Sequence, residues 1–270
     1  MQPAPLNSNQ WHAAIVGNLS VRQVVENVVN ENNAWFPAVL AATAPGDSLL
    51  ELGCGTGVFS GILAKKGRRT TLLDYSAESV EFCRKVFAQA GLPGNFVQAD
   101  VCRTLPFADD AFDCTWSSGL LEHFTDEQLL FILKESARVS RRCVVSLVPN
   151  ARSIFYRLGK WYQEQHGLWA WGKEDPKRTM KSFFEAAGLV DVREFTIDVK
   201  TAIAFVHPIR AKMLRKSLLL LSRLLPEAGW RFLNQGYLLV TIGQKPETIR
   251  HHRDGGGRKL DFSDGIGIVT

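Results

Sequence analysis

The feature that most constrains the fold is an alternation of short β-rich runs with longer helical patterns, which begins at Ser48. Such alternation is typical of a mostly parallel sheet with helices on both faces. The sequence predicts an α/β, Rossmann-like, doubly wound sheet of seven strands whose last strand is antiparallel and lies in the interior or at the edge. The predicted strands are 48–53, 69–75, 95–101, 112–118, 142–148, 190–197 and 236–245. The predicted helices between them include 56–66, 76–90, 126–139 and 176–187.

The first predicted strand runs directly into a glycine-rich turn, LLELGCGTG, from Leu49 to Gly57. A strand that ends this way and opens a helix presents backbone N–H groups to a nucleotide-like ligand. The turn is not a dinucleotide fingerprint, because Val58 and Ser60 stand where GxGxxG needs its third glycine, and no phosphate-loop GK[ST] follows. Glu51 would repel a diphosphate and attract a cation. A sulfonium ligand that carries an amino group fits these residues.

At this point the chain resembles a known family, the class I S-adenosylmethionine (SAM)-dependent methyltransferases. Within that family it resembles the broad bacterial group that acts on small molecules, the methyltransferase type 11-like proteins. The resemblance covers Ser48 to about Pro149 and continues more weakly to Lys245. Its motifs are ELGCGTG at 51–57, the acid Asp74, QADV at 98–101, LPFADDAFD at 105–113 and SSGLLEHF at 117–124.

The resemblance implies SAM as the cofactor, with a site assembled from successive strand ends. Glu51 and the turn from Gly53 to Gly57 would line the methionine part of SAM. Asp74 would bind the ribose hydroxyls, and its distance of about 20 residues from the glycines is what a neighbouring strand requires. Asp100 would accept a hydrogen bond from the adenine amino group. The full set of expected cofactor contacts is Glu51, Gly53, Cys54, Gly55, Gly57, Asp74, Tyr75, Asp100, Val101 and Ser117.

His123, in the SSGLLEHF segment, has two interpretations. A histidine at this place in the family often holds the loop after the fourth strand, and it is also the candidate general base if the acceptor is a hydroxyl. A base is not obligatory, because SAM supplies its own leaving group and the protein mainly aligns the reactants. We predict no metal site, since no carboxylate cluster can be assembled from the sequence and the cysteines form no CxxC pair. The adjacent His251 and His252 lack a third ligand nearby.

Segments outside the shared core are expected to determine the acceptor. An N-terminal helical cap at 1–46 precedes the methyltransferase domain at 47–246. Its residues available to cover the cofactor include Trp11, Val24, Val28, Trp35 and Phe36. An insertion at 150–176 is rich in aromatic residues, which predict either an apolar acceptor pocket or lid, or packing onto the sheet. These aromatic residues are Phe155, Tyr156, Trp161, Tyr162, Trp169 and Trp171. The basic residues of the insertion are expected at the solvated surface or, as the alternative, in contact with an anionic acceptor; they are Arg152, Arg157, Lys160 and Lys173.

A second insertion, at 201–230, contains a basic amphipathic stretch at 209–225. It predicts peripheral contact with an anionic membrane or, as the alternative, a crossover helix or dimer interface. Residues 247–270 predict a flexible tail. The absence of a long apolar run and of a signal-like start predicts a cytoplasmic protein.

The acceptor expected from these features is a small apolar or lipid-linked metabolite. Nucleic acid is disfavoured, because the 32 basic and 27 acidic residues are interspersed and the segment after the fourth strand is SSGL rather than [DNS]PP[YF]. The alternatives are a protein or nucleic-acid methyltransferase, or a protein of the same fold that binds SAM without turnover. The sequence leaves the oligomeric state open.

Overall fold

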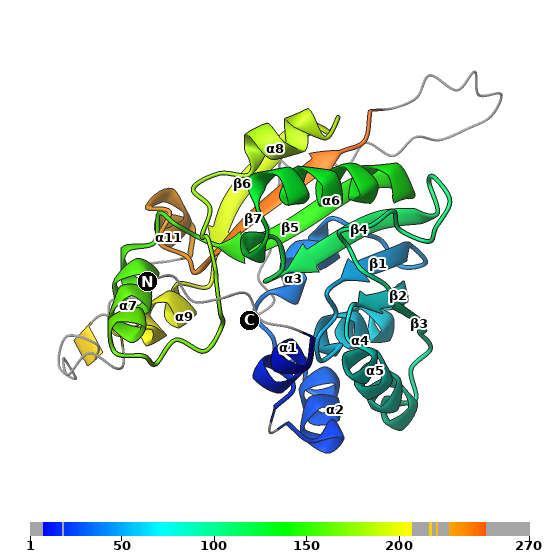
Figure 1. Cartoon of the computed structure of the whole chain (residues 1–270), viewed down its shortest axis with the longest axis horizontal. Helices are drawn as coiled ribbons and strands as arrows, with labels where there is room; N and C mark the ends of the chain where they lie inside the picture. The colour runs from blue at the N-terminus through cyan, green and yellow to red at the C-terminus, as the bar shows by residue number, and fades with distance from the viewer. Residues whose placement is uncertain (1–7, 18, 207–215, 218–219, 221–226, 247–270) are drawn as a thin grey trace.

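The computed structural model of the chain describes residues 8–17, 19–206, 216–217, 220 and 227–246. Within these residues, seven strands form one sheet in the order β3-β2-β1-β4-β5-β7-β6 (Figure 1). The strands are β1 (Ser48–Leu52), β2 (Arg69–Asp74), β3 (Asn95–Gln98), β4 (Phe112–Ser118), β5 (Ser140–Pro149), β6 (Val190–Ile197) and β7 (Leu238–Gln244). The pairings among β1 to β5 are parallel, and β7 is antiparallel to both β5 and β6. The predicted doubly wound sheet with an antiparallel last strand is therefore confirmed, and that strand lies in the interior.

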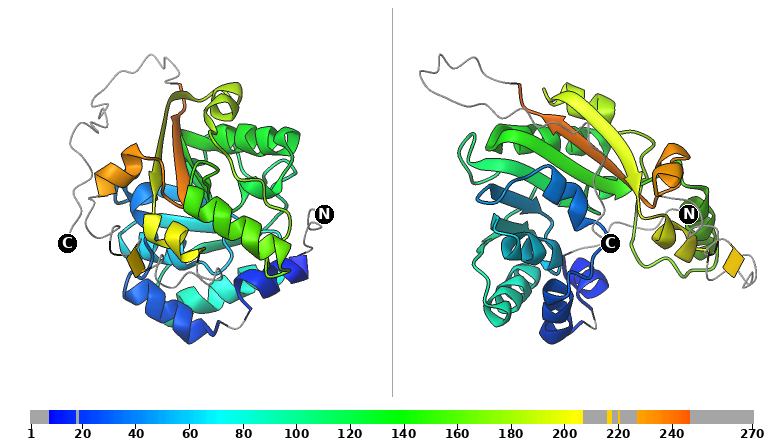
Figure 2. Two further views of the ribbon diagram at one scale, coloured as in Figure 1. Left: turned by 90° about the vertical axis from the view of Figure 1, so that its left-hand side faces the viewer. Right: turned by 180° about the vertical axis from the view of Figure 1, so that it is seen from behind.

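Helices cover both faces of the sheet (Figures 1 and 2). On one face lie α6 (Asp126–Val139) and α8 (Lys181–Ala186), packed on a core that includes Leu50 and Leu52. The helices that pack on the opposite face are α2 (Val21–Val29), α3 (Phe36–Ala41), α4 (Val58–Lys65) and α5 (Ala77–Ala90). The remaining described helices are α1 (Ser8–Ile15), the 3-10 turn η1 (Leu121–His123), α7 (Ile154–Gln165), α9 (Val199–Ala204) and α11 (Glu227–Phe232). Helices α7, α9 and α11 gather beyond the carboxyl end of β5 (Figure 1).

Helix ends follow their local sequence signals. The side chain of Ser76 accepts a hydrogen bond from the backbone of Ser79 at the start of α5, and Gly91 closes that helix in a left-handed conformation. Thr125 and Gln128 form a capping box at the start of α6. These caps explain why the predicted boundaries of α5 and α6 are close to the observed ones.

Two boundaries differ from the sequence prediction, in each case because other hydrogen bonds compete with those of the expected element. The helix expected at 176–187 begins at Lys181, because Lys177 pairs its backbone with the end of β5 in an extended arrangement. The strand expected to reach Val101 ends at Gln98, because the Asp100 carboxylate accepts from the backbone N–H of Cys102 at 2.9 Å and folds the chain into a turn.

Some predictions fall on residues outside the described ranges. These are most of the basic amphipathic stretch at 209–225, the tail at 247–270, and His251 and His252 within it. Among the helices that are described, none combines the length and the apolar character needed to cross a membrane.

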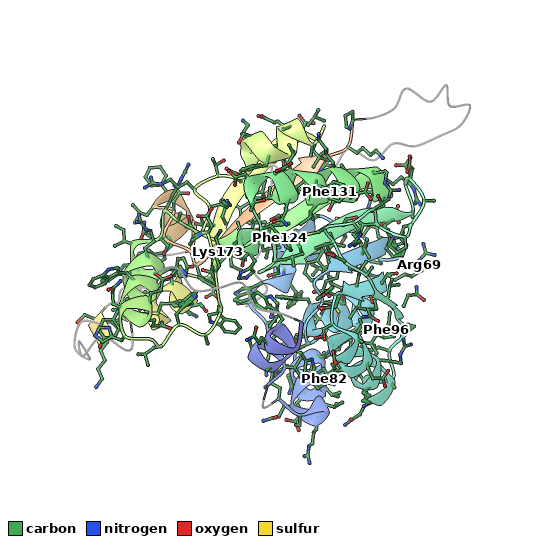
Figure 3. The ribbon with its side chains drawn as sticks, viewed as in Figure 1. Arg69, Phe82, Phe96, Phe124, Phe131 and Lys173 are labelled. Carbon is green, nitrogen blue, oxygen red and sulfur yellow. The ribbon has the colours of Figure 1, made fainter. Side chains whose placement is uncertain are left out.

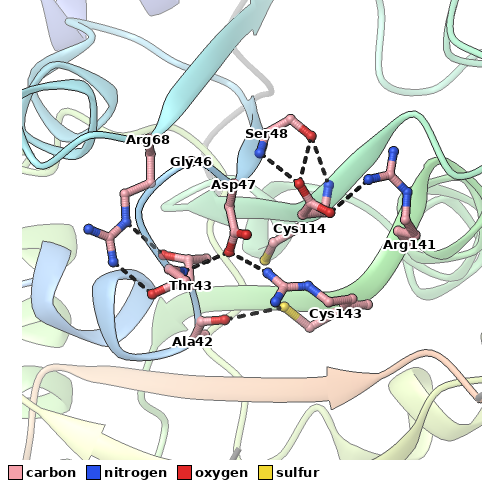
Figure 4. Close-up of polar contacts among 12 residues, drawn as sticks. Ala42, Thr43, Gly46, Asp47, Ser48, Arg68, Cys114, Arg141 and Cys143 are labelled. Atoms are coloured by element: carbon pink, nitrogen blue, oxygen red, sulfur yellow. Dashed lines mark hydrogen bonds and ion pairs between the residues drawn. The ribbon is translucent and has the colours of Figure 1, made fainter. Parts of the chain in front are cut away.

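The amino ends of β1, β4 and β5 are tied together by a polar network on the side away from the glycine turn (Figure 4). The Asp113 carboxylate accepts from the backbone N–H of Ser48 at 2.8 Å and from its hydroxyl at 3.0 Å, and it pairs with Arg141 at 2.8 Å. Asp47 forms an ion pair with Arg142. These contacts fix the lateral register of the three central strands.

Replacing Asp113 with alanine tests this network. The substitution leaves the N–H of Ser48 and the Nη1 group of Arg141 without their acceptor, and the Asp113 side chain is only 16% exposed. We expect the free energy of unfolding to fall by about 1–3 kcal/mol, measured by urea denaturation. Glu185→Ala, which removes an exposed helix-surface carboxylate, should change it by less than about 0.5 kcal/mol. Equal effects of the two substitutions would contradict the proposed role of the network.

Candidate functional site

The strand order reverses beside β1, with β2 on one side and β4 on the other. In open α/β sheets, ligands bind outside the carboxyl ends of the strands at such a switch point. The glycine turn after β1 and the segment after β4 meet there, since a Cβ built on Gly53 would lie 2.9 Å from the side chain of Leu120. The sequence motifs at 51–57 and 117–124 are therefore brought together in space.

Each glycine of the ELGCGTG turn is in the left-handed region of backbone conformation. The φ angles are 69° at Gly53, 51° at Gly55 and 72° at Gly57. Side chains rarely adopt these angles, because the Cβ atom approaches the following carbonyl oxygen. The three glycines are thus needed for the shape of this turn, which positions the start of α4.

Asp74, at the end of β2, holds the turn from the neighbouring strand. One oxygen of its carboxylate accepts from the backbone N–H of Gly55 at 3.0 Å, and the other accepts from Ser76 at 3.0 Å. Burial raises the pKa of Asp74, and the N–H groups of Ser76 and Gly55 act in the opposite direction. A carboxylate offers about four lone-pair positions, so two remain for hydroxyl donors of a ligand.

Glu51 lies in β1 with 3% of its surface exposed, and its Oε2 has no hydrogen-bond partner among the described residues. Burial raises the pKa of Glu51 well above its usual range. A buried carboxylate oxygen without a partner is costly, so this position favours a ligand that brings a positive charge or hydrogen-bond donors.

The other expected cofactor residues surround the same edge. The Asp100 side chain is 36% exposed and its Oδ2 lies 3.7 Å from Arg103, while Val101 is buried. Tyr75 is 58% exposed next to Asp74, and Ser117 is buried near the end of β4. The thiol of Cys54 is buried and is not available to a ligand through its sulfur, which lies 3.6 Å from the sulfur of Cys83.

Helix α1 lies across the turn. A Cβ at Gly55 would come within 2.9 Å of Ile15, and Nδ1 of His12 lies 3.1 Å from the hydroxyl of Ser79. The ring of Trp11 meets that of His123 edge-on, with centroids 4.5 Å apart. The helix therefore touches the segments that follow β1, β2 and β4. The sequence did not show that α1 reaches all three, because its contacts are distant along the chain.

The other N-terminal residues that were expected to cover the cofactor pack against the rest of the protein instead. Val24 and Val28 are fully buried against α4 and α5, and a Cβ on Gly61 would collide with Val28 at 2.8 Å. Trp35 packs near Phe59 and donates its indole N–H to Asp198 at 2.7 Å. Of the residues expected to cover the cofactor, Trp11 is the one that these contacts place beside the segment after β4.

A buried polar cluster lies next to α1, formed by Glu122, His123 and Glu174. One carboxylate or imidazole atom from each lies within 4.8 Å of the others. Nδ1 of His123 donates to the carbonyl of Lys173 at 2.6 Å, and burial lowers the pKa of His123. Burial raises the pKa of Glu122, and the nearby Glu174 raises it further. Lys173 and Phe124, both labelled in Figure 3, mark where the loop after α7 meets the segment after β4.

The sequence missed this cluster, because its second carboxylate, Glu174, comes from the insertion. It also misplaced Lys160, which was expected at the solvated surface and is 7% exposed. Lys160 lies 2.8 Å from Glu164 and 3.7 Å from the ring centroid of Trp169. The aromatic residues of the insertion fall into two groups, since Tyr156 is fully buried whereas Trp161 and Trp171 are 56% and 39% exposed. Tyr156 is therefore a candidate for packing onto the sheet, and Trp161 and Trp171 are candidates for contact with an apolar acceptor.

Comparison with known proteins adds to this geometry. Residues 49–142 match the model of a methyltransferase domain family. Residues 49–142 are therefore a methyltransferase domain, as the resemblance to the class I SAM-dependent methyltransferases implied.

The relatives of this chain differ in what their names say they modify. The malonyl-[acyl-carrier protein] O-methyltransferase of Serratia marcescens is 28% identical over 53% of this chain and 51% of that protein. The probable tRNA methyltransferase 9B of Homo sapiens is 31% identical over 50% of this chain and 26% of that protein. The chain thus spans about half or less of the length of these relatives.

Among solved structures, the complex of the Haloferax volcanii Trm112 methyltransferase activator with its putative methyltransferase is similar, with a TM-score of 0.54. The sequences are 21% identical, and the match covers 86% of this chain and 97% of that one. At this identity the likeness shows the fold alone.

The residues at the switch point fit SAM. The unpartnered Oε2 of the buried Glu51 suits the ligand's ammonium group, and the free lone pairs of Asp74 suit the ribose hydroxyls. Gly55 lets α1 approach the turn closely, because a Cβ there would lie 2.9 Å from the side chain of Ile15. SAM would supply the activated methyl group, and the protein would hold and orient it.

Replacing Gly57 with alanine tests the turn. The new Cβ would lie 2.9 Å from the sulfur of Cys83 and 3.1 Å from Leu72, in addition to adopting a φ of 72°. We expect the free energy of unfolding to fall by roughly 2–5 kcal/mol, from backbone strain and overpacking together. Gly91→Ala is the matched control, since its φ is 66° but no atom lies within 4 Å of the new Cβ. It should cost only the backbone part, about 1–2 kcal/mol. A smaller loss for Gly57→Ala than for Gly91→Ala would refute the packing argument.

Proposed function

We propose that this chain transfers the methyl group of SAM to a small acceptor that is apolar or linked to a lipid. The observation that carries the cofactor part is Asp74, whose carboxylate is held at the switch point by Gly55 and Ser76 with lone pairs to spare. Glu51, Asp100 and the glycine turn surround the same edge. Transfer requires an in-line arrangement of acceptor, methyl carbon and sulfur, which positioning alone can provide.

The acceptor part of the proposal is supported by exposed apolar side chains on the insertion. Ile154, Leu158 and Trp161 recur at helical spacing on α7 and are 67%, 44% and 56% exposed. Leu168 and Trp171 in the following loop are 57% and 39% exposed. Large apolar groups gathered on one helix face favour contact with an apolar ligand or a lipid surface. The same insertion contributes Glu174 beside His123, so the apolar face and the reacting edge belong to neighbouring parts of the molecule.

Two alternatives keep the fold. A tRNA-directed relative is among those that match, and binding of nucleic acid would show a steep dependence on salt. A protein that binds SAM without turnover would have the same cofactor residues. His123 is the candidate base for a hydroxyl acceptor, although its Nδ1 is engaged by the Lys173 carbonyl.

The cofactor assignment is tested by thermal unfolding with SAM and with S-adenosylhomocysteine, and with NAD as the control ligand. A ligand at about 100 times its dissociation constant stabilises by roughly 2.7 kcal/mol, which moves the midpoint by several degrees. We expect both sulfur ligands to stabilise the protein and NAD not to. Asp74→Asn removes the negative charge but keeps a side-chain oxygen, and should weaken both ligands at least about tenfold.

The matched variant is Glu81→Gln on the exposed face of α5, where the carboxylate is 55% exposed, and it should bind as the wild type does. If NAD alone stabilised the protein, or if neither SAM nor S-adenosylhomocysteine did, the assignment of SAM as the cofactor would be wrong. If Asp74→Asn bound SAM with unchanged affinity, Asp74 would not belong to the cofactor site.

The lipid-linked acceptor is tested by sedimentation with vesicles of phosphatidylglycerol and phosphatidylcholine. The double substitution Leu158→Ser, Trp161→Ser removes two members of the exposed α7 face and should reduce the bound fraction several-fold. Phe131→Ser changes an exposed apolar residue on α6 instead (Figure 3) and should leave binding unchanged. Absence of binding by the wild type, or an equal loss in both variants, would argue for an acceptor free in solution.

A further inference from the structure

The cluster of Glu122, His123 and Glu174 is assembled by tertiary contacts. Glu122 and His123 lie in η1 after β4, and Glu174 lies in the loop after α7. The loop is bound to η1 by its backbone, because the Lys173 carbonyl accepts from His123 at 2.6 Å and the N–H of Asp175 donates to the Glu122 carbonyl at 2.8 Å. The two carboxylates are therefore held in place together, and their side chains are only 2% and 5% exposed.

The hydrogen bond between His123 and Lys173 leaves the other ring nitrogen of His123 with a lone pair. A carbonyl oxygen can only accept, so Nδ1 of His123 carries the proton that it shares with Lys173. Nε2 of the neutral ring is then an acceptor, and it faces Oε1 of Glu122 at 3.7 Å. Two acceptors that face each other need a cation or a proton between them. Histidines bound to a metal commonly donate their other N–H to a backbone carbonyl, as this one does.

A second, independent observation that points to a bound cation comes from the side chain of Glu122. Its Oε2 is buried and has no hydrogen-bond partner among the described residues. The charges of Lys160 and Lys177 act against the burial that raises the pKa of Glu122. No hydrogen bond joins either ammonium group to Oε2 of Glu122, and Lys160 lies 2.8 Å from Glu164. The ammonium group of Lys177 is likewise held, by Asp126 at 3.0 Å and Asp175 at 2.7 Å. An unpaired carboxylate inside a protein is costly unless a charge compensates it.

We propose that Glu122, His123 and Glu174 bind a divalent transition-metal ion. Three ligand atoms spread evenly at about 2.2 Å from one ion lie at most about 3.8 Å from one another, so atoms that lie within 4.8 Å need to close by at most about 1 Å. One imidazole and two carboxylates suit Zn²⁺, Mn²⁺ or Fe²⁺ better than Mg²⁺, which prefers oxygen ligands alone.

Groups around Glu174 leave room for the ion. The hydroxyl of Tyr156 donates to Oε1 of Glu174, and Lys160 lies 3.7 Å from the same oxygen. The second oxygen of that carboxylate has lone pairs free for a metal. The positive charge of Lys160 weakens the affinity but does not occupy the position, since its shortest contact is with Glu164.

Three protein ligands leave coordination positions open, which distinguishes such a site from a closed structural one. An open position next to the segment after β4 would bind an acceptor oxygen, so the metal points to a hydroxyl-bearing acceptor; this step rests on the proposed function. In that case His123 is a metal ligand and not the general base, because a bound Nε2 has no lone pair left for a proton.

The test is calorimetric titration of the EDTA-treated full chain with ZnCl₂, MnCl₂ and MgCl₂, in the absence of SAM. We expect one saturable site that binds Zn²⁺ and Mn²⁺ more tightly than Mg²⁺. Glu122→Gln and Glu174→Gln should each weaken Mn²⁺ binding at least tenfold, whereas Glu185→Gln on the exposed face of α8 should not. The double substitution His251→Ala, His252→Ala should also leave it unchanged.

Thermal unfolding of the same variants separates folding from binding. In EDTA, Glu122→Gln should unfold no earlier than the wild type, because it removes a buried carboxylate without a partner. With Mn²⁺ the wild type should become the more stable of the two. Three results would each overturn the site: absence of saturable binding in the wild type, wild-type affinity in Glu122→Gln or Glu174→Gln, and loss of binding in the His251/His252 variant. Since no SAM is present, these outcomes are distinguishable from a failure of cofactor binding in Asp74→Asn.

Discussion

The candidate site depends on the hydrogen bonds that the Asp74 carboxylate accepts from Gly55 and Ser76. They join the turn after β1 to the turn after β2, so that the two turns are held in a fixed arrangement at one edge of the sheet. The bonds require the left-handed backbone that glycine supplies at 53, 55 and 57. The same edge receives α1 on one side and the segment after β4 on the other. Without this tie the residues expected to contact SAM would lie on separate, independently moving loops.

Features that depend on neighbours in the sequence were predictable. The strands, the caps of α5 and α6 and the glycine turn follow from local composition, since Ser76, Gly91 and Thr125 act within one helical turn. The antiparallel last strand was also predicted. The errors at Lys181 and Gln98 arose where backbone pairing with a distant strand, or a side-chain turn, outweighed the local propensity of the sequence.

Features that depend on tertiary contact were not predictable from one sequence. Nothing local to Glu174 indicates that it lies beside Glu122, because the loop that carries it is positioned by backbone bonds to η1. The burial of Lys160 has the same origin, since its partners Glu164 and Trp169 enclose it only once the insertion folds back. The sequence argument against a metal site failed to see the cluster for this reason: a ligand set spread over two distant segments has no characteristic spacing.

Buried acids gather at one edge of a chain whose formal net charge is +5. Glu51 and Asp74 lie at the glycine turn, and Glu122 and Glu174 lie beyond β4. An edge of this kind attracts cations, which suits both a sulfonium ligand and a metal ion. On the proposed function, methyl transfer removes the charge of the sulfonium, so the product keeps the hydrogen bonds of SAM but loses part of its attraction to these carboxylates. The electrostatics that help to bind SAM therefore also favour release of S-adenosylhomocysteine, and they do so without any movement of the protein.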